Sequence, residues 1–222
     1  MNSPLPTRFP IFPLPDVVLF PDVRLPLHIF EPRYRAMTRD AIDGEGAIGM
    51  VLLQPDVDPR ETCAPIFDTG CLGRIVKHEE LSDGRFMLVL EGERRFRIEC
   101  EEDSDAPYRS VRAELLPDPA FDALDEATRF TLTRARGELE RRMLSIARTH
   151  RPDAARLLAD RMRALDPIAL LHAIAFGLDC GPLEKQGLLE APDPLSRAHL
   201  LGRLFEFREA ESQLSFTPKN VN

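Results

Sequence analysis

Short apolar runs separated by Pro, Gly and Asp occupy the first half of the chain, and several of them alternate between hydrophobic and polar residues. This pattern predicts β-strands. The predicted strands are Phe9–Leu14, Val17–Phe20, Leu25–Phe30, Ala47–Leu53, Cys71–His78, Phe86–Glu91, Arg94–Cys100 and Arg109–Leu115. The segment 82–85 (Ser-Asp-Gly-Arg) predicts a hairpin turn, and residues 91–93 (Glu-Gly-Glu) predict a second turn. Prolines inside Phe9–Leu14 and Leu25–Phe30 favour edge or bulged strands there.

One helix is predicted among these strands. Pro32 suits the first helical position, and apolar residues then recur at helical spacing as far as Gly44. We therefore expect a single inserted helix that starts at Pro32.

The second half has a helical period. Beyond residues 117–119 (Pro-Asp-Pro), apolar positions step by three and four, which predicts a helix from about residue 124 to 149. Further helices are predicted over Ile168–Leu178, over Pro182–Glu190 and from Pro194 to about Ser212. Asp166 and Asp193 are the expected N-caps, because a proline follows each of them. The tail after Ser215 is expected to be loose. The chain thus divides into a β-rich subdomain, residues 8–117, and a helical subdomain, residues 120–212.

The composition is that of a globular protein. The chain has 222 residues, of which 43% are hydrophobic and 30% charged, and its net charge is −8. This balance disfavours a general polyanion binder. The longest apolar stretch, Ile168–Leu178, is too short to span a membrane. Prolines near the N-terminus disfavour a signal peptide. The four cysteines form no CxxC pair, so we expect reduced thiols and a cytoplasmic protein.

No motif for catalysis, a metal or a cofactor is evident. A P-loop requires Gly before its lysine, whereas the three lysines follow Val76, Glu184 and Pro218. There is no GxSxG nucleophile motif, and the five histidines show no metal-ligand spacing. We expect no catalytic residue, metal ion or cofactor; an enzyme with an unfamiliar site is the alternative.

Several strings, taken together, resemble one known family. Phe12-Pro13-Leu14, Val18-Leu19-Phe20-Pro21 and the run Leu25–Arg35 (LPLHIFEPRYR) resemble the N-terminal substrate-binding domain of the Lon ATP-dependent proteases. Similar blocks follow at Ala47–Val51, Gly70–Ile75, Asp83–Ile98 and Lys185–Glu190. The resemblance implies an α+β fold, in which a PUA-like β pseudo-barrel with one inserted helix precedes a C-terminal α-helical bundle. Asp22 stands where the family commonly has a glycine. The ATPase and protease modules of complete Lon proteases are expected to be absent.

The resemblance implies a non-catalytic module that binds unfolded or tagged polypeptides, with an adaptor role in protein quality control beside a protease complex as one form of that function. Edge strands suit this role because they can accept an extended peptide by β-augmentation. The candidate peptide-binding residues are Phe20, His28, Phe30, Glu31, Arg33, Tyr34, Arg74 and Arg95. At each of these positions a structural role is the alternative to peptide binding. The apolar residues would belong to the core, Glu31 would stabilise a helix start, and the arginines would lie on a solvated face.

A second charged feature lies in the helical half. Residues 134–163 contain nine arginines and four acids, whereas acids cluster after a predicted strand at residues 99–105. A solvated helix face, a docking surface for an acidic partner or for this chain's own acidic loop in a homodimer, and an RNA-binding PUA-like module are the alternatives. The lack of Trp and the presence of only two Tyr disfavour nucleic acid. A small-ligand-binding protein is a further alternative.

Overall fold

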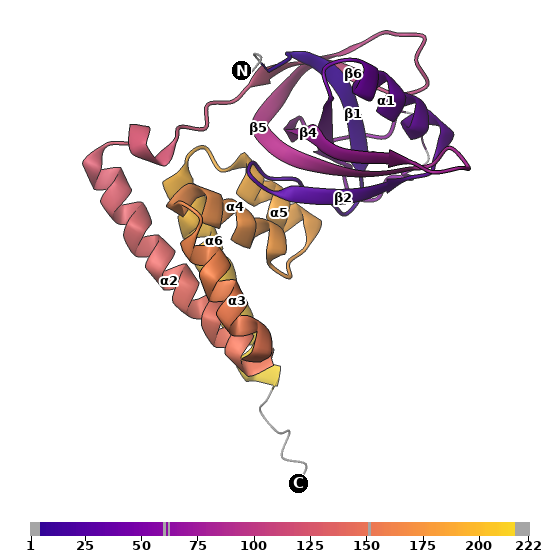
Figure 1. The fold of residues 1–222 in the computed structure, drawn as a ribbon. Coiled ribbons are helices and arrows are strands. Elements are labelled where there is room, and N and C mark those ends of the chain that lie inside the picture. The colour runs from indigo at the N-terminus through magenta and orange to yellow at the C-terminus, as the bar shows by residue number, and fades with distance from the viewer. Residues whose placement is uncertain (1–4, 60, 62, 151, 216–222) are drawn as a thin grey trace. The chain divides into compact units, whose positions relative to one another are not determined.

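The computed structural model describes residues 5–59, 61, 63–150 and 152–215 (Figure 1). The strands are β1 (Arg8–Leu14), β2 (Arg24–Ile29), β3 (Ala47–Leu52), β4 (Thr69–Glu80), β5 (Phe86–Glu102) and β6 (Ser110–Leu115). The helices are α1 (Pro32–Asp43), the 3-10 turn η1 (Phe121–Ala123), α2 (Glu126–His150), α3 (Pro152–Arg163), α4 (Pro167–Gly177), α5 (Pro182–Glu190) and α6 (Pro194–Ser215). The predicted α+β class is confirmed. The tail after residue 215 lies outside the described residues.

The six strands form one mixed sheet that closes on itself. Its order is β2-β5-β4-β3-β1-β6, and β6 also pairs with β5, so that five strands complete a ring. The β1–β3 pair is parallel and the other pairs are antiparallel. The first half of β5 pairs with β2 and its second half with β6, which places β2 outside the ring. Closure removes most sheet edges and leaves β2 as an edge strand.

The turn predicted at residues 91–93 is absent, because β5 runs through it as one strand of 17 residues. Gly92 is required for another reason: a Cβ at this position would lie 2.1 Å from the carbonyl oxygen of Phe20. The glycine therefore permits a close backbone approach rather than a reversal. The strand predicted at Val17–Phe20 is also wrong; this run forms a loop whose last three residues are buried.

Apolar side chains from the strands fill the barrel. Phe9, Ile11, Val51, Leu72 and Phe96 belong to one buried cluster, and the rings of Phe9 and Phe96 meet edge to face at a centroid distance of 4.9 Å. Gly49 and Gly70 leave room for these rings, since an added Cβ at either position would meet Phe96 at 3.0 Å or less. The core thus depends on glycines placed next to large aromatic side chains.

The chain divides into two compact units. The first contains the strands as far as Asp118 together with His172–Glu190, and the second contains Pro119–Leu171 and the chain from Ala191 onward. The sequence placed residues 172–190 with the helices, whereas the contacts group them with the barrel. Within the first unit, α5 is fastened to the strands: Nε2 of Gln186 donates to the carbonyl of Thr69 at 2.9 Å.

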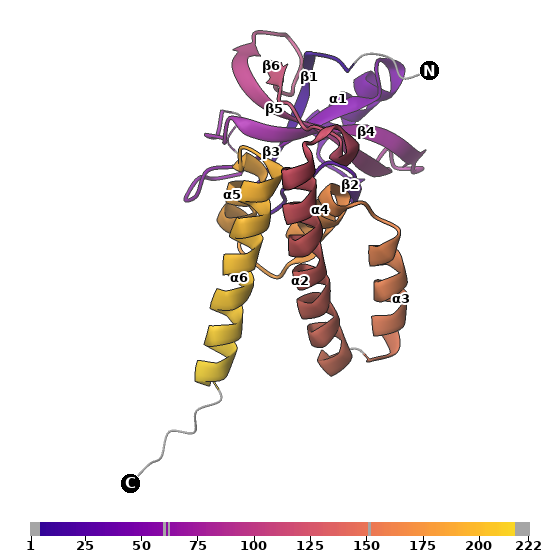
Figure 2. The same ribbon diagram turned by 90° about the vertical axis from the view of Figure 1, so that its left-hand side faces the viewer.

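The second unit is built on α2. Helices α3 and α6 both pack against it, and Figure 2 shows α2 between them. The predicted N-caps are confirmed: the Asp166 carboxylate accepts the backbone N–H of Ile168 at 2.8 Å, and that of Asp193 accepts the N–H of Ser196 at 2.9 Å. No helix within the described residues is both long enough and apolar enough to cross a membrane.

Candidate polypeptide-binding surface

The outer edge of β2 carries backbone groups that pair with no strand in the described part of the chain. The N–H of Gly92 donates to the carbonyl of Val23 at 2.9 Å, which fixes the phase of the β2–β5 ladder. Hydrogen-bonded pairs alternate in an antiparallel ladder. The residues of β2 that bond to β5 are therefore Leu25, Leu27 and Ile29. The backbone groups of Arg24, Pro26 and His28 point away from β5. Pro26 has no N–H, so it occupies a position where β5 requires none.

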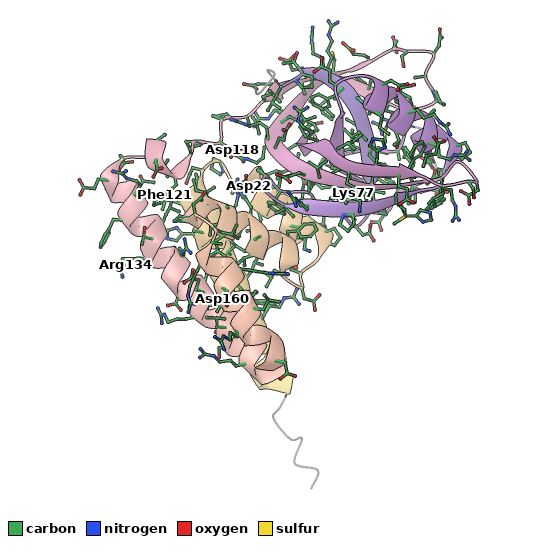
Figure 3. All side chains as sticks on the ribbon, in the orientation of Figure 1. Asp22, Lys77, Asp118, Phe121, Arg134 and Asp160 are labelled. Atoms are coloured by element: carbon green, nitrogen blue, oxygen red, sulfur yellow. The ribbon has the colours of Figure 1, made fainter. Side chains whose placement is uncertain are left out.

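Exposed apolar side chains lie beside this edge. Phe30, which directly follows β2, is 60% exposed, and its ring lies 5.9 Å from that of His28. Met87 on β5 is also exposed and is the cross-strand partner of His28. Val76 is also exposed, on β4, which β5 separates from β2; it lies where the β4 register shifts, beside Lys77, which is labelled in Figure 3. An open edge flanked by apolar side chains has the chemistry needed to hold an extended polypeptide.

Glu31, Arg33 and Tyr34 form a second group at the start of α1. The Nε of Arg33 donates to the carboxylate of Glu31 at 3.0 Å, and its guanidinium lies 4.5 Å from the centre of the Tyr34 ring. Tyr34 is buried against Phe12, with ring centroids 4.4 Å apart. Burial raises the pKa of the Tyr34 phenol, although the neighbouring Arg33 charge works against that rise. Arg33 and Tyr34 line a cavity of about 230 Å³.

The other three candidates are buried or paired within the barrel unit. Phe20 is completely buried. Arg74 donates to Glu93 at 2.7 Å, and this hydrogen bond raises the pKa of its guanidinium. Arg95, only 2% exposed, pairs with Asp118 at 2.8 Å and donates to the carbonyl of Leu189 at 2.9 Å. These contacts give the three residues structural roles and leave His28 and Phe30 as the predicted residues on the open face.

The arginines of the helical unit are partly paired within it. Arg136 donates to Glu140 at 2.8 Å and to the carbonyl of Met162 at 2.9 Å, next to the last residue of α3. Arg142 donates to Glu138 at 2.9 Å and to Glu209 at 3.0 Å. Because Met162 lies in the last turn of α3, the positive charge of Arg136 also stabilises α3 through its helix dipole, which is negative at the C-terminal end. Part of the local excess of positive charge is therefore neutralised by acids of the same unit.

Sequence reasoning missed Met87, Val76 and most of the cavity. Met87 alternates outward in the part of β5 that was predicted as a strand, Phe86–Glu91, so the period-two pattern could have placed it on the same face as His28. The exposure of Val76 depends on a register shift in β4, which no local sequence pattern predicts. The cavity brings together α1, the loop before Ala64 and the loop between β5 and β6, which are far apart in sequence. In the part of the chain that the structure describes, no group of three or more potential metal ligands occurs.

Comparison with known proteins decides the family. Residues 8–206 match the family model described as the ATP-dependent protease La (LON) substrate-binding domain. The chain belongs to this family. The match covers both units, so the helices as well as the barrel are part of the family domain.

The curated relatives are much longer than this chain. The Lon protease 2 of Sorangium cellulosum is 30% identical over 227 residues, which cover 96% of this chain and 27% of that protein. The Lon protease of Cytophaga hutchinsonii is 25% identical over 201 residues, or 90% of this chain and 24% of that protein. The chain therefore spans about a quarter of the length of these Lon proteases.

Solved structures agree on the fold. The N-terminal domain of Mycobacterium avium complex Lon protease superposes with a TM-score of 0.69 at 19% identity, covering 90% of this chain and 98% of that one. A Lon N-terminal domain protein from Xanthomonas campestris gives a TM-score of 0.58 at 22% identity, covering 95% of this chain and 99% of that one. Both neighbours match almost from end to end, as expected for a shared domain.

Proposed function

We propose that this Lon-type domain binds unfolded or tagged polypeptides without acting on them chemically, and that it holds them along the outer edge of β2. The observation that carries the proposal is the open backbone edge of β2 beside the exposed ring of Phe30, in a chain that belongs to a substrate-binding family. An adaptor role beside a proteolytic machine follows from the same proposal, because a domain that only holds a chain must pass it to another component.

The edge suits short segments rather than long sheets. Arg24 and His28 each present an N–H and a carbonyl, whereas Pro26 presents a carbonyl alone. An added strand would therefore make hydrogen bonds on both sides of a gap at Pro26. Interrupted pairing of this kind limits edge-to-edge aggregation between copies while still accepting a peptide. The apolar side chains of that peptide would contact Phe30 and Met87.

The proposal is tested by titrating fluorescently labelled, extended apolar peptides into the protein and recording anisotropy. We expect Phe30→Ser to weaken binding by about tenfold, since an exposed aromatic at a binding surface contributes about 1–2 kcal/mol. Phe207→Ser is the matched control: Phe207 is exposed to a similar degree but lies on α6 in the other unit. Equal losses from both substitutions, or no peptide binding by the unaltered protein at high micromolar concentration, would reject the proposal.

A further inference from the structure

The guanidinium of Arg35, near the start of α1, packs against the turn that joins β4 to β5. Its Nη2 lies only 2.1 Å from the position that a Cβ at residue 84 would occupy, so the glycine there makes room for it. Gly84 also has a positive φ of 77°, which suits glycine. The arginine is half-buried, and its Nε is fully buried. The side chain is therefore held against the turn rather than extended into solvent.

This side chain has no partner in the described part of the chain. Its Nε is buried without a hydrogen-bond partner, and no ion pair joins the guanidinium to a described residue. Nη1 and Nη2 also lack a described partner but are not buried, so a ligand can reach them. A half-buried cation is costly when no hydrogen bond replaces the water that it has lost. Arg35 therefore favours a ligand that accepts hydrogen bonds.

The acids around Arg35 leave its charge uncompensated. Three acidic side chains lie just before α1, at the end of β4 and in the turn, and each already accepts a hydrogen bond from another arginine. The pairs are Glu31 with Arg33 at 3.0 Å, Glu80 with Arg39 at 2.7 Å and Asp83 with Arg85 at 2.7 Å. Among the described residues of this junction, Arg35 is thus a cation in excess. An anion would be attracted to it, and a carboxylate matches the planar fork of a guanidinium with two hydrogen bonds.

Arg35 lies close to the surface beside the β2 edge. Its backbone N–H donates to the carbonyl of Glu31 at 2.9 Å, which places it one helical turn, about 6 Å, from the residue that follows Phe30. The Cα atoms of Phe30 and Arg35 are therefore at most about 10 Å apart. The cross-strand partner of the last β2 residue is Phe86, which follows Gly84 by two residues. A polypeptide held beside Phe30 can thus present a carboxylate to Arg35.

We propose that Arg35 binds a carboxylate of the polypeptide held on the β2 edge, supplied by an Asp or Glu side chain or by the C-terminus. The inference rests on the proposed function and adds to it a preference for an acidic group in the segment that passes Phe30. Phe30 provides the apolar contact, and Arg35 selects the charge of the neighbouring group.

The test uses an apolar peptide that binds the β2 surface, with glutamate or glutamine at each position in turn and with a free or amidated C-terminus. At one of these places we expect the carboxylate to bind roughly five- to tenfold more tightly than its amide. The ratio should fall to about one in Arg35→Met, and to an intermediate value in Arg35→Lys, which keeps the charge but not the planar fork. Arg97→Met is the matched control and should keep the ratio, because Arg97 is an exposed arginine of the same unit with no described ion pair.

The outcomes separate this inference from the proposed function. Equal binding of every carboxylate and its amide overturns the Arg35 assignment and leaves the β2 proposal intact. An equal loss of the ratio in Arg97→Met also overturns the assignment. If Arg35→Met does not fold, Arg35→Lys decides, and a ratio equal to that of the unaltered protein overturns it. An effect confined to the free C-terminus identifies the terminal carboxylate as the ligand, and an effect of an internal glutamate identifies a side chain.

A test with acetate does not depend on peptide binding. If no peptide binds, the β2 proposal fails, and acetate becomes the probe. Shifts of the Gly84 amide resonance with acetate in the unaltered protein, absent in Arg35→Met, support the carboxylate site; their absence overturns it. Tighter binding of inorganic phosphate than of any carboxylate peptide contradicts a polypeptide source.

Discussion

Asp22 and His172 meet although 150 residues separate them: Oδ2 of Asp22 lies 3.3 Å from Nδ1 of the fully buried His172. Asp22 occupies the left-handed region, with φ of 62°. The aspartate therefore satisfies two requirements, the backbone geometry of a tight turn and a polar partner for a buried imidazole.

Substitutions at Asp22 should separate these two contributions. Asp22→Gly keeps the backbone relaxed and removes only the partner of His172, whereas Asp22→Ala also forces an alanine into the left-handed region. We expect Ala to be less stable than Gly by about 1 kcal/mol. Urea unfolding measures the difference. Equal stability of the two variants would show that the turn does not require a left-handed residue in solution.

Arg95 joins three parts of the barrel unit. It is buried, pairs with Asp118 and donates to the carbonyl of Leu189 at the end of α5. Arg95→Ala leaves the Asp118 carboxylate without its partner and should lower the free energy of unfolding by about 3–5 kcal/mol. Arg95→Met, which retains the bulk of the side chain, should be less damaging. Increased amide exchange in α5 would localise the effect, and unchanged α5 protection would contradict the fastening role.

Alanine substitutions at Gly92 and Gly137 are expected to change the stability of the protein in opposite directions. An alanine Cβ at position 92 would lie 2.1 Å from the carbonyl oxygen of Phe20, whereas at position 137, inside α2, no atom lies within 4 Å. We expect Gly92→Ala to destabilise the protein by more than about 2 kcal/mol through the displaced backbone. Gly137→Ala should stabilise it by about 0.5–1 kcal/mol through helix propensity. Thermal unfolding of both variants tests the pair, and similar shifts in the same direction would refute the close-approach account.

The two tyrosines should titrate late. Burial and the hydrogen bond to Asp40 raise the pKa of Tyr108 to about 12, and burial raises that of Tyr34 above its ordinary value of 10.0. Because the folded pKa exceeds the unfolded one, the stabilisation from Tyr108 is complete below about pH 10 and is lost as the pH rises towards 12. The chain contains no Trp, so absorbance in the tyrosinate band, where phenylalanine does not absorb, reports the ionisation of these two phenols alone. A Tyr108→Phe variant should lose less stability than the unaltered protein across that interval, and ordinary titration of both phenols would contradict the burial of Tyr34 and the contact of Tyr108 with Asp40.

Local signals predicted much of the fold. The period-two strands and the Asp-Pro helix starts were found because each depends on neighbours in sequence, and α5 was predicted with its observed bounds. The turn at residues 91–93 was predicted wrongly at Gly92, because a glycine between two charged residues has the same local sequence whether it forms a turn or allows another backbone segment to approach closely. The strand at Val17–Phe20 was predicted wrongly because a short apolar run is typical of a buried loop as well as of a short strand. Both errors come from the contact between Phe20 and Gly92, which joins segments about 70 residues apart.

The site was only partly accessible to sequence reasoning. Phe20 and Phe30 occur in one proline-rich string, yet the first is fully buried and the second is 60% exposed. Which of them faces outward depends on the pairing of β2 with β5, a long-range contact. Arg95 similarly looked like a residue on a wet strand face, and its burial follows from α5, which lies far along the chain.

The most direct test of the account is amide hydrogen exchange, residue by residue along β2, with and without a bound apolar peptide. The amides of Leu25, Leu27 and Ile29 already donate within the ladder and should exchange slowly in both states. Those of Arg24 and His28 should exchange quickly in the free protein and slow markedly when the peptide binds, because the added strand accepts their hydrogen bonds. Peptide binding that leaves the Arg24 and His28 amides unprotected would contradict recognition at this edge.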